Sequence, residues 1–201
     1  MSSRWSRNRR DSQGLRAGRS RSIRGIVLRS FIILARKTDL ASNRGLLTRF
    51  IAGSLLLSHG TRKDVWAAVL FDDEVLVSFE GWAMRNVRPD EQSLSGILRA
   101  GLRKAEEGKK PRVLQGVSAK RADIADLAPR LPGRRFFFDG PGSTHGIGAD
   151  ISVVFCCKGI DHGVSDWLKS SGFDPLRLGA RRLTADQAAV IVNNAIDRSQ
   201  P

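Results

Sequence analysis

The chain has 201 residues, 41% of them hydrophobic, and is long enough to bury the core of one α/β domain. Its 34 Lys and Arg against 20 Asp and Glu give a formal net charge of +14. This charge favours nucleic acid over an acidic small molecule as partner, because each neutralised phosphate releases counterions. No stretch approaches the about 20 apolar residues of a membrane span and no signal-peptide core follows the basic start, so we expect a soluble cytoplasmic protein without a membrane partner.

The first 25 residues hold half of the excess charge. They contain eight arginines against one aspartate, a net +7, among Ser and Gly residues. Such a stretch buries too little apolar surface to order itself, so we expect a disordered basic tail over residues 1–25 and a folded domain over residues 26–201. Three interpretations of the tail stay open: an RNA-binding arm, an organellar transit peptide, or translated leader upstream of a misassigned start, with the true initiator near Val27 or Leu28.

The first half of the domain predicts a strand, a helix, a hairpin and a second helix. Residues 26–34 are rich in β-branched and aromatic types, and residues 44–58 repeat apolar positions at helical spacing before Gly60. Residues 64–70 and 75–79 form the expected hairpin, residues 85–90 a loop, and Leu94 to Leu102 the second helix.

The second half alternates between strands and helices. In chain order we expect a short strand near Val113, a helix at about 119–128 and a short strand at 135–138. A strand at 151–157, a helix at 165–170, a strand at 176–178 and a helix at 184–198 should follow. Thr184 and Gln187 form a T-x-x-Q capping box for the last helix. This alternation indicates an α/β fold with a mainly parallel sheet.

Several residue types that carry chemistry elsewhere have structural interpretations here. The two cysteines, Cys156 and Cys157, are adjacent in a strand and point to opposite faces, so we expect core residues that neither pair nor chelate. Residues 140–148 are glycine-rich but precede a strand, which predicts a flexible loop, able to act as a lid, rather than a dinucleotide loop. The three histidines lack ligands at metal spacing, so no metal is expected and His59 should cap or pack.

Arg62, Lys63 and Asp64 form a charged triplet between a predicted helix and a predicted strand. By composition alone a solvated turn is the simplest interpretation of such a triplet. Loops at the edge of an α/β sheet are also where functional side chains gather, so the residues alone leave both interpretations open.

Four segments resemble motifs of the archaeal-type tRNA pseudouridine N1-methyltransferases, the TrmY family of the SPOUT superfamily. Residues 58–65, SHGTRKDV, resemble S-H-G-x-R-x-D-V, and residues 88–93, RPDEQS, resemble P-D-E-R-S. Residues 178–186, LGARRLTAD, resemble L-G-P-x-x-L-H-A-D, and residues 194–198, NAIDR, resemble N-E-L-D-R. The resemblance implies a SPOUT-like α/β fold with a C-terminal trefoil knot, a homodimer, tRNA as partner and S-adenosylmethionine as cofactor.

The resemblance also implies roles for single residues. Cofactor contacts are expected from the loops that follow the last strands, at Cys157, Gly159, Leu178, Gly179, Leu183, Thr184 and Ala188. Asp64 and Arg62 are the expected catalytic residues: Asp64 would hold or accept the N1 proton, and Arg62 would bind the neighbouring phosphate. Lys63, at the same phosphate, and Arg88 are the expected RNA-binding residues. The chain has Thr184, Ala180 and Ala188 where the family commonly has His, Pro and Cys, which raises the alternative of a catalytically silent RNA-binding protein with this fold.

Overall fold

The computed structural model of the chain describes residues 29–108, 111–143 and 147–199, and the expected basic tail at 1–25 lies outside them. One sheet has the strand order β10 (Asp174–Leu176), β8 (Arg134–Phe138), β9 (Ile151–Cys156), β1 (Arg29–Ala35), β4 (Val65–Phe71), β5 (Val75–Glu80), β7 (Val117–Arg121) and β6 (Arg112–Leu114). The helices are α1 (Asp39–Ser42), α2 (Arg44–Leu55), α3 (Glu91–Glu106), α4 (Ile124–Leu127), α5 (His162–Ser170) and α6 (Ala185–Ser199), with a short 3-10 turn at Ala128–Arg130.

The sheet is parallel from β10 to β4 and antiparallel from β4 to β6. The expected α/β class with a mostly parallel sheet is therefore confirmed. Arg29 pairs with Val65 on β4 and with Ile151 on β9, so β1, β4 and β9 begin at one edge of the sheet. Their carboxyl ends meet at the opposite edge, where ligands of open α/β sheets commonly bind.

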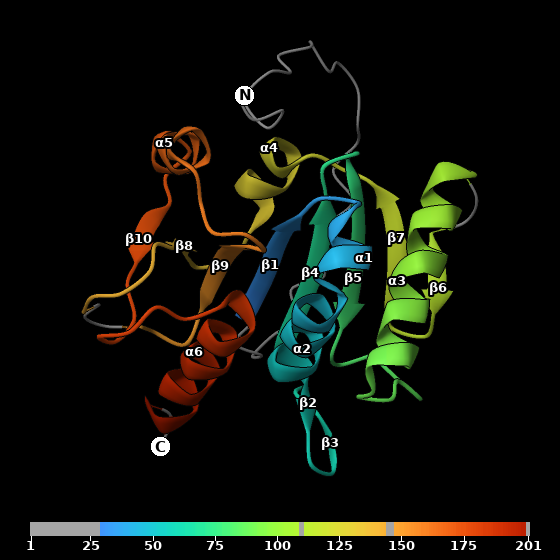
Figure 1. Ribbon diagram of the computed structural model, residues 1–201. Helices are drawn as coiled ribbons and strands as arrows, with labels where there is room; N and C mark the ends of the chain where they lie inside the picture. The colour runs from blue at the N-terminus through green and yellow to red at the C-terminus, as the bar shows by residue number, and fades with distance from the viewer. Residues whose placement is uncertain (1–28, 109–110, 144–146, 200–201) are drawn as a thin grey trace.

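The central strands of the sheet are buried on both sides, because helices cover both of its faces. Along β1, Phe31 and Ile33 face the cluster that α2, α3 and α6 cover, whereas Ile32 and Leu34 face the cluster covered by α4 and α5. This alternation follows from the two-residue period of a strand. Figure 1 shows α2 and α6 side by side on one face, with β1 and β4 behind them.

Several expected elements differ from the structure. The helix expected at about 119–128 is wrong in its first part: Val117–Arg121 is strand β7, which pairs with β5, and the helix begins at Ile124 after Asp123, whose side chain accepts a hydrogen bond from the Ala125 amide. Sheet pairing overrides local helix propensity there. The strand expected at 176–178 is β10, two residues earlier.

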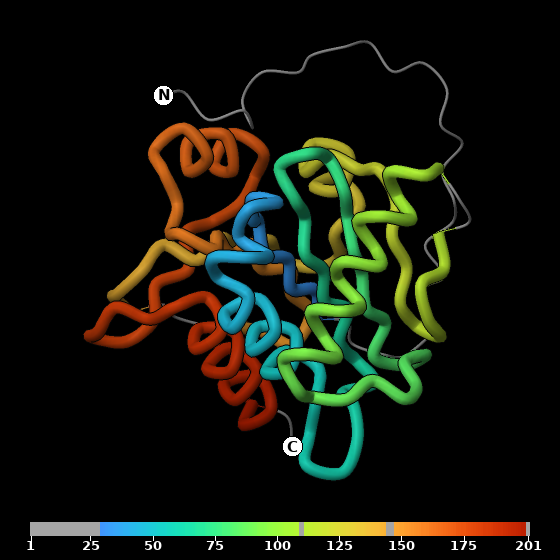
Figure 2. The backbone as a smooth tube through the Cα atoms, turned by 45° about the vertical axis from the view of Figure 1, so that its right-hand side comes forward, coloured from blue at the N-terminus to red at the C-terminus, as the bar shows by residue number. Residues whose placement is uncertain are grey.

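The helix expected at 44–58 ends at Leu55, where a small hairpin of β2 (Leu56–Leu57) and β3 (Gly60–Thr61) begins. His59 lies exposed in the turn of that hairpin, so the prediction that it caps or packs is wrong. Figure 2 shows the hairpin projecting from the body of the domain. Within the described ranges, every helix is too short or too polar to cross a bilayer.

The final helix is confirmed at Ala185–Ser199, together with part of its cap. The Thr184 amide donates a hydrogen bond to Oε1 of Gln187 at 3.0 Å, as a capping box requires. The helix buries Ala188, Val192 and Ile196 against the sheet and packs along α2.

Candidate functional site

A cavity of about 470 Å³ opens at the carboxyl edge of the parallel strands. Three loops form its walls: the one after β8, the one after β9, and the one that leads into α6. The lining residues are Phe138, Asp139, Gly140, Pro141, Cys156, Cys157, Lys158, Gly159, Ile160, Arg182, Leu183, Thr184 and Ala185. A cavity of this size lies within the about 300–1,000 Å³ of small-molecule sites.

Four of the expected cofactor residues line this cavity, namely Cys157, Gly159, Leu183 and Thr184. The other three lie around it. Leu178 and Ala188 belong to the buried core, and the carbonyl of Gly179 accepts a hydrogen bond from the Gly142 amide at 2.7 Å. The substitution at Ala188, where the family commonly has Cys, therefore changes the core and not the cavity wall.

The loop after β8 belongs to the site, although its sequence predicted only a flexible loop. Gly140 and Pro141 line the cavity, and the Leu178 amide donates to the Gly140 carbonyl at 2.9 Å. The loops after β8 and β10 therefore run side by side as a continuation of the β8–β10 pairing. The sequence predicted the strand before this loop, and the parallel pairing of that strand with β9 brings the loop to the same sheet edge as the loop after β9.

Two glycines leave backbone open at the cavity. Gly140 and Gly159 have φ of +90° and +81°, and a Cβ on either would meet nothing within 4 Å. Glycine supports this conformation at low cost, and the missing side chains let a ligand approach the backbone closely. These two positions therefore leave open space beside the backbone of the cavity loops.

The cavity is neutral at its thiols and cationic at its rim. Burial raises the pKa of both Cys156 and Cys157 to about 12, so both stay protonated at neutral pH and neither is a nucleophile. They pack on opposite faces of the sheet as expected, but both are only half-buried and line the cavity, which corrects the prediction of plain core residues. The rim cations are Lys158 and Arg182.

The Lys158 ammonium is held by a buried carboxylate. Its Nζ lies 3.1 Å from Oδ1 of Asp39, whose side chain also accepts hydrogen bonds from the Arg36 amide and from Asn43. Burial of Asp39 opposes its ionisation, but these hydrogen bonds and Lys158 outweigh burial and lower its pKa. The pair ties the loop after β9 to the start of α1.

A second polar cluster brings together motif residues from both ends of the domain. Arg29, only 3% exposed, places Nε 2.9 Å from Oδ2 of Asp64 and an Nη 2.7 Å from Oδ1 of Asp197. Arg62 binds the other oxygen of Asp197 at 2.7 Å. Arg29 also donates to Asn193, which in turn donates to carbonyls of α2. Burial would raise the pKa of Asp197, but the two guanidinium groups outweigh it and lower the pKa.

This charged cluster lies at the other edge of the sheet from the cavity. Asp64 precedes β4 and Arg29 begins β1, whereas the cavity loops follow β8 and β9. A seven-residue strand such as β4 is about 23 Å long. Helix α6 spans the same interval, with Ala185 at the cavity and Asp197 at the cluster. Asp64 and Arg62 are therefore brought together with each other but not with the cavity of their own chain.

The two expected RNA contacts also lie apart from the cavity. The Lys63 ammonium donates to Thr61 Oγ1 at 2.7 Å and to the Gly81 carbonyl at 3.3 Å. Gly81 lies tightly against this segment, because a Cβ on it would come within 1.9 Å of the Arg62 carbonyl. Arg88 lies exposed in the loop before α3. The described residues contain no group of three or more His, Cys, Asp or Glu side chains arranged to hold a metal ion.

Comparisons with known proteins agree on one family. A family model described as "Putative SAM-dependent RNA methyltransferase" matches residues 28–201. The tRNA (pseudouridine(54)-N(1))-methyltransferase of Haloarcula marismortui is 30% identical over 173 residues, which cover 79% of this chain and 86% of the relative. The enzyme of the same name from Methanosarcina acetivorans is 26% identical over 171 residues, 80% of this chain and 81% of that one.

A solved structure shares the fold. The crystal structure of Archaeoglobus fulgidus Nep1 bound to S-adenosylhomocysteine superposes with a TM-score of 0.56 at 14% identity, over 84% of this chain and 97% of that one. The family model covers nearly the whole chain and the sequence relatives cover four fifths of it. This chain therefore belongs to the family of S-adenosylmethionine-dependent RNA methyltransferases that includes the archaeal tRNA pseudouridine N1-methyltransferases.

Proposed function

We propose that this protein transfers a methyl group from S-adenosylmethionine to N1 of a pseudouridine in tRNA. The similarity to the Haloarcula enzyme over four fifths of the chain carries this proposal. The cavity between the loops after β8 and β9 supplies a place for the cofactor. The net charge of +14 suits a tRNA substrate.

The residues of the cavity fit this cofactor. Gly140 and Gly159 leave open backbone for the adenosine, Leu183 supplies an apolar wall, and Lys158 offers a cation to the carboxylate of the methionine part. When bound, the cofactor supplies an electrophilic methyl group on a sulfonium. The protonated thiols of Cys156 and Cys157 do not compete for that methyl group.

Methyl transfer needs a group that removes the N1 proton of the base. The new N1–carbon bond forms as the carbon–sulfur bond breaks, and the proton must leave N1 for a nearby acceptor. We assign this role to Asp64, whose carboxylate is oriented by Arg29, with Arg62 beside it to bind a phosphate or the uracil oxygens. Both side chains reach solvent at the sheet edge.

Because Asp64 lies about 23 Å from the cavity of its own chain, we infer that the active site is shared between two copies. The outer face of α6 exposes Val190 and Ile191 at 49% and 41%, midway between Ala185 and Asp197. In a two-fold dimer the same patch contacts itself. Two α6 helices packed antiparallel on this patch place the charged cluster of each copy beside the cavity of the other.

We also propose that the C-terminal segment forms the trefoil knot of SPOUT methyltransferases. The loops after β8 and β10 run side by side, joined by the hydrogen bonds from Leu178 to Gly140 and from Gly142 to Gly179, and α6 then packs against α2. The silent RNA-binding alternative rests on the three departures at Thr184, Ala180 and Ala188. Thr184 lines the cavity, but Ala188 is fully buried outside the cavity wall, so that departure leaves the wall unchanged and favours the active enzyme.

The function is tested by methyl transfer to matched RNAs. The purified chain should methylate tRNA with pseudouridine at position 54, the position in the names of the relatives, and should leave the same transcript with uridine there unmodified. Mass spectrometry of the nucleosides identifies the product. Cofactor binding without transfer to the pseudouridine tRNA would contradict the proposed substrate, and absence of cofactor binding would contradict the enzyme.

A further inference from the structure

A second groove lies at the far edge of the sheet, between α3 and the edge strand β6. Its volume is about 420 Å³. The residues that line it are Asn86, Arg88, Ser93, Gly96, Ile97, Ala100, Lys104, Val113 and Leu114. In the strand order it is five strands away from β9, or about 24 Å from the cofactor cavity.

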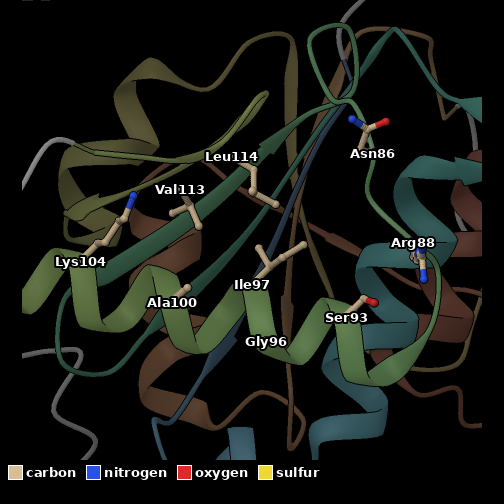
Figure 3. A pocket seen from close by; sticks show the side chains of 9 residues that line it. All are labelled: Asn86, Arg88, Ser93, Gly96, Ile97, Ala100, Lys104, Val113 and Leu114. Atoms are coloured by element: carbon tan, nitrogen blue, oxygen red, sulfur yellow. The ribbon is translucent and has the colours of Figure 1, made fainter.

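The groove has an apolar floor with a cation at each end. Figure 3 shows the side chains of Ile97, Val113 and Leu114 facing one another, with Lys104 near one end of α3 and Arg88 near the other. Leu114 is 40% exposed, one of the few large apolar side chains at the surface of the described residues. A Cβ on Gly96 would meet nothing within 4 Å, so this glycine leaves room over the helix.

The acidic side chains of α3 form ion pairs outside the groove, whereas Lys104, one of its basic residues, lines the groove. Glu91 pairs with Arg44 of α2, and Glu106 pairs with Lys37 in the loop after β1, so both carboxylates are neutralised away from the groove. None of the nine described residues that line the groove is acidic. The ammonium of Lys104 donates to the Arg112 carbonyl at 2.6 Å, which fixes it at the end of the groove.

We propose that this groove binds an unpaired segment of a few nucleotides of the substrate RNA, outside the segment that is methylated. A base lies on the apolar floor, and phosphates on either side of it along the strand lie at Arg88 and Lys104. A cationic rim on an apolar floor suits an RNA segment better than an apolar peptide, because an apolar peptide brings no negative charge to Arg88 and Lys104. Side chains recognise RNA mostly through unpaired bases, because the major groove of an RNA helix is too narrow to enter.

This inference rests on the proposed function, since it assigns a second contact to the same RNA. The test uses Gly96→Leu, which fills the groove, and Arg88→Ala, which removes its cation. Leucine at an open helical position favours folding over glycine, so Gly96→Leu should fold. Arg99→Ala is the matched control, because Arg99 lies exposed on α3 but does not line the groove.

The measurements are fluorescence anisotropy with the pseudouridine tRNA, and calorimetry with S-adenosylmethionine as a check of the remote cavity. Gly96→Leu should weaken tRNA binding by about fivefold, the low end for a base contact because the floor is aliphatic. Arg88→Ala should reduce the salt dependence of binding by about one phosphate contact. Cofactor affinity should stay unchanged in both variants.

The outcomes separate this inference from the proposed function. If the wild-type protein methylates the tRNA but Gly96→Leu and Arg88→Ala bind it as tightly as Arg99→Ala does, the groove does not bind RNA and a protein partner becomes its best occupant. If the wild-type protein neither binds nor methylates the tRNA, the proposed function itself fails. A loss of binding confined to the two groove variants supports the inference.

Discussion

Mixing two inactive variants should restore activity if the active site is shared between two copies. Asp64→Ala removes the proposed proton acceptor, and Gly159→Leu obstructs the cavity and strains a backbone with φ of +81°. A mixed dimer of the two variants keeps one complete site, made from the cavity of the first copy and Asp64 of the second. Random exchange makes about half of the dimers mixed, so activity should recover to about a quarter of the wild-type rate.

A double variant gives the control for this experiment. If the site is shared, wild type mixed equally with Asp64→Ala/Gly159→Leu should retain about a quarter of its activity. In a mixed dimer, the intact cavity then faces the Asp64→Ala substitution and the intact Asp64 faces the obstructed cavity, so neither site is complete. Sites contained in one chain would instead retain about a half, and the two single variants would not complement. Methyl transfer to the pseudouridine tRNA measures both mixtures after subunit exchange.

The magnitude of the contact follows from the exposed patch on α6. Val190 and Ile191 are each about half exposed, so full burial would add about 1 kcal/mol per side chain, or about 4 kcal/mol for the four side chains of two copies. Ile191→Glu removes two of these four side chains, about 2 kcal/mol, and should therefore weaken the dimer by about thirtyfold or more, since it also adds facing carboxylates. Leu114→Glu, at a similarly exposed apolar position on the opposite edge, is the matched control for dimer association alone, because Leu114 also lines the groove proposed to bind RNA. A fully active monomer in sedimentation experiments would refute the shared site.

Three further predictions follow from single contacts. Because burial raises the pKa of Cys156 and Cys157 to about 12, alkylation by iodoacetamide should be roughly a thousandfold slower than for a free thiol, and should become fast only in denaturant. The pKa of Asp39 is lowered in the folded state, so the ionised carboxylate stabilises the fold above its unfolded pKa of about 3.9, and this stabilisation disappears as pH falls through the folded pKa. Asp39→Asn should therefore reduce the pH dependence of the free energy of unfolding on the acid side, measured by urea unfolding. At pH 7 the substitution should cost about 1–3 kcal/mol. Gly81→Ala should destabilise the fold by about 1–3 kcal/mol and reduce turnover, because the new Cβ displaces the Arg62 carbonyl; unchanged melting and turnover would contradict this.

The sequence predicted best those elements whose local pattern and tertiary role agree. The hairpin of β4 and β5 and the amphipathic helix α6 are examples, since alternation and helical periodicity there match what the sheet buries. The region of β7 was predicted as a helix because its pairing partner, β5, lies some forty residues earlier in the chain. Local propensity carries no information on such a partner.

Only part of the candidate site was predicted, because local sequence carries no information on which loops the sheet brings together. Residues near the start of α6 and after β9 were expected at the cofactor because their motif resembles a family, and four of them line the cavity. The loop after β8 was missed, since its glycine and proline indicated flexibility and the sequence did not say which strands lie beside the predicted strand at 135–138. Its role follows only from the pairing of β8 with β9 and β10, which aligns the three loops at one sheet edge.

The resemblance grouped Asp64 with the cofactor residues, but only the topology says how they can meet. Parallel strands carry every residue that precedes them to one edge and every residue that follows them to the other. Asp64 precedes β4 and the cofactor loops follow β8 and β9, so rotation of side chains in one chain cannot close a gap of about 23 Å. Helix α6 bridges that gap with Asp197 at one end and Ala185 at the other, and an antiparallel copy of the same helix reverses the ends. If Asp64 takes part in methyl transfer, this fold therefore requires a second copy to bring it to the cofactor.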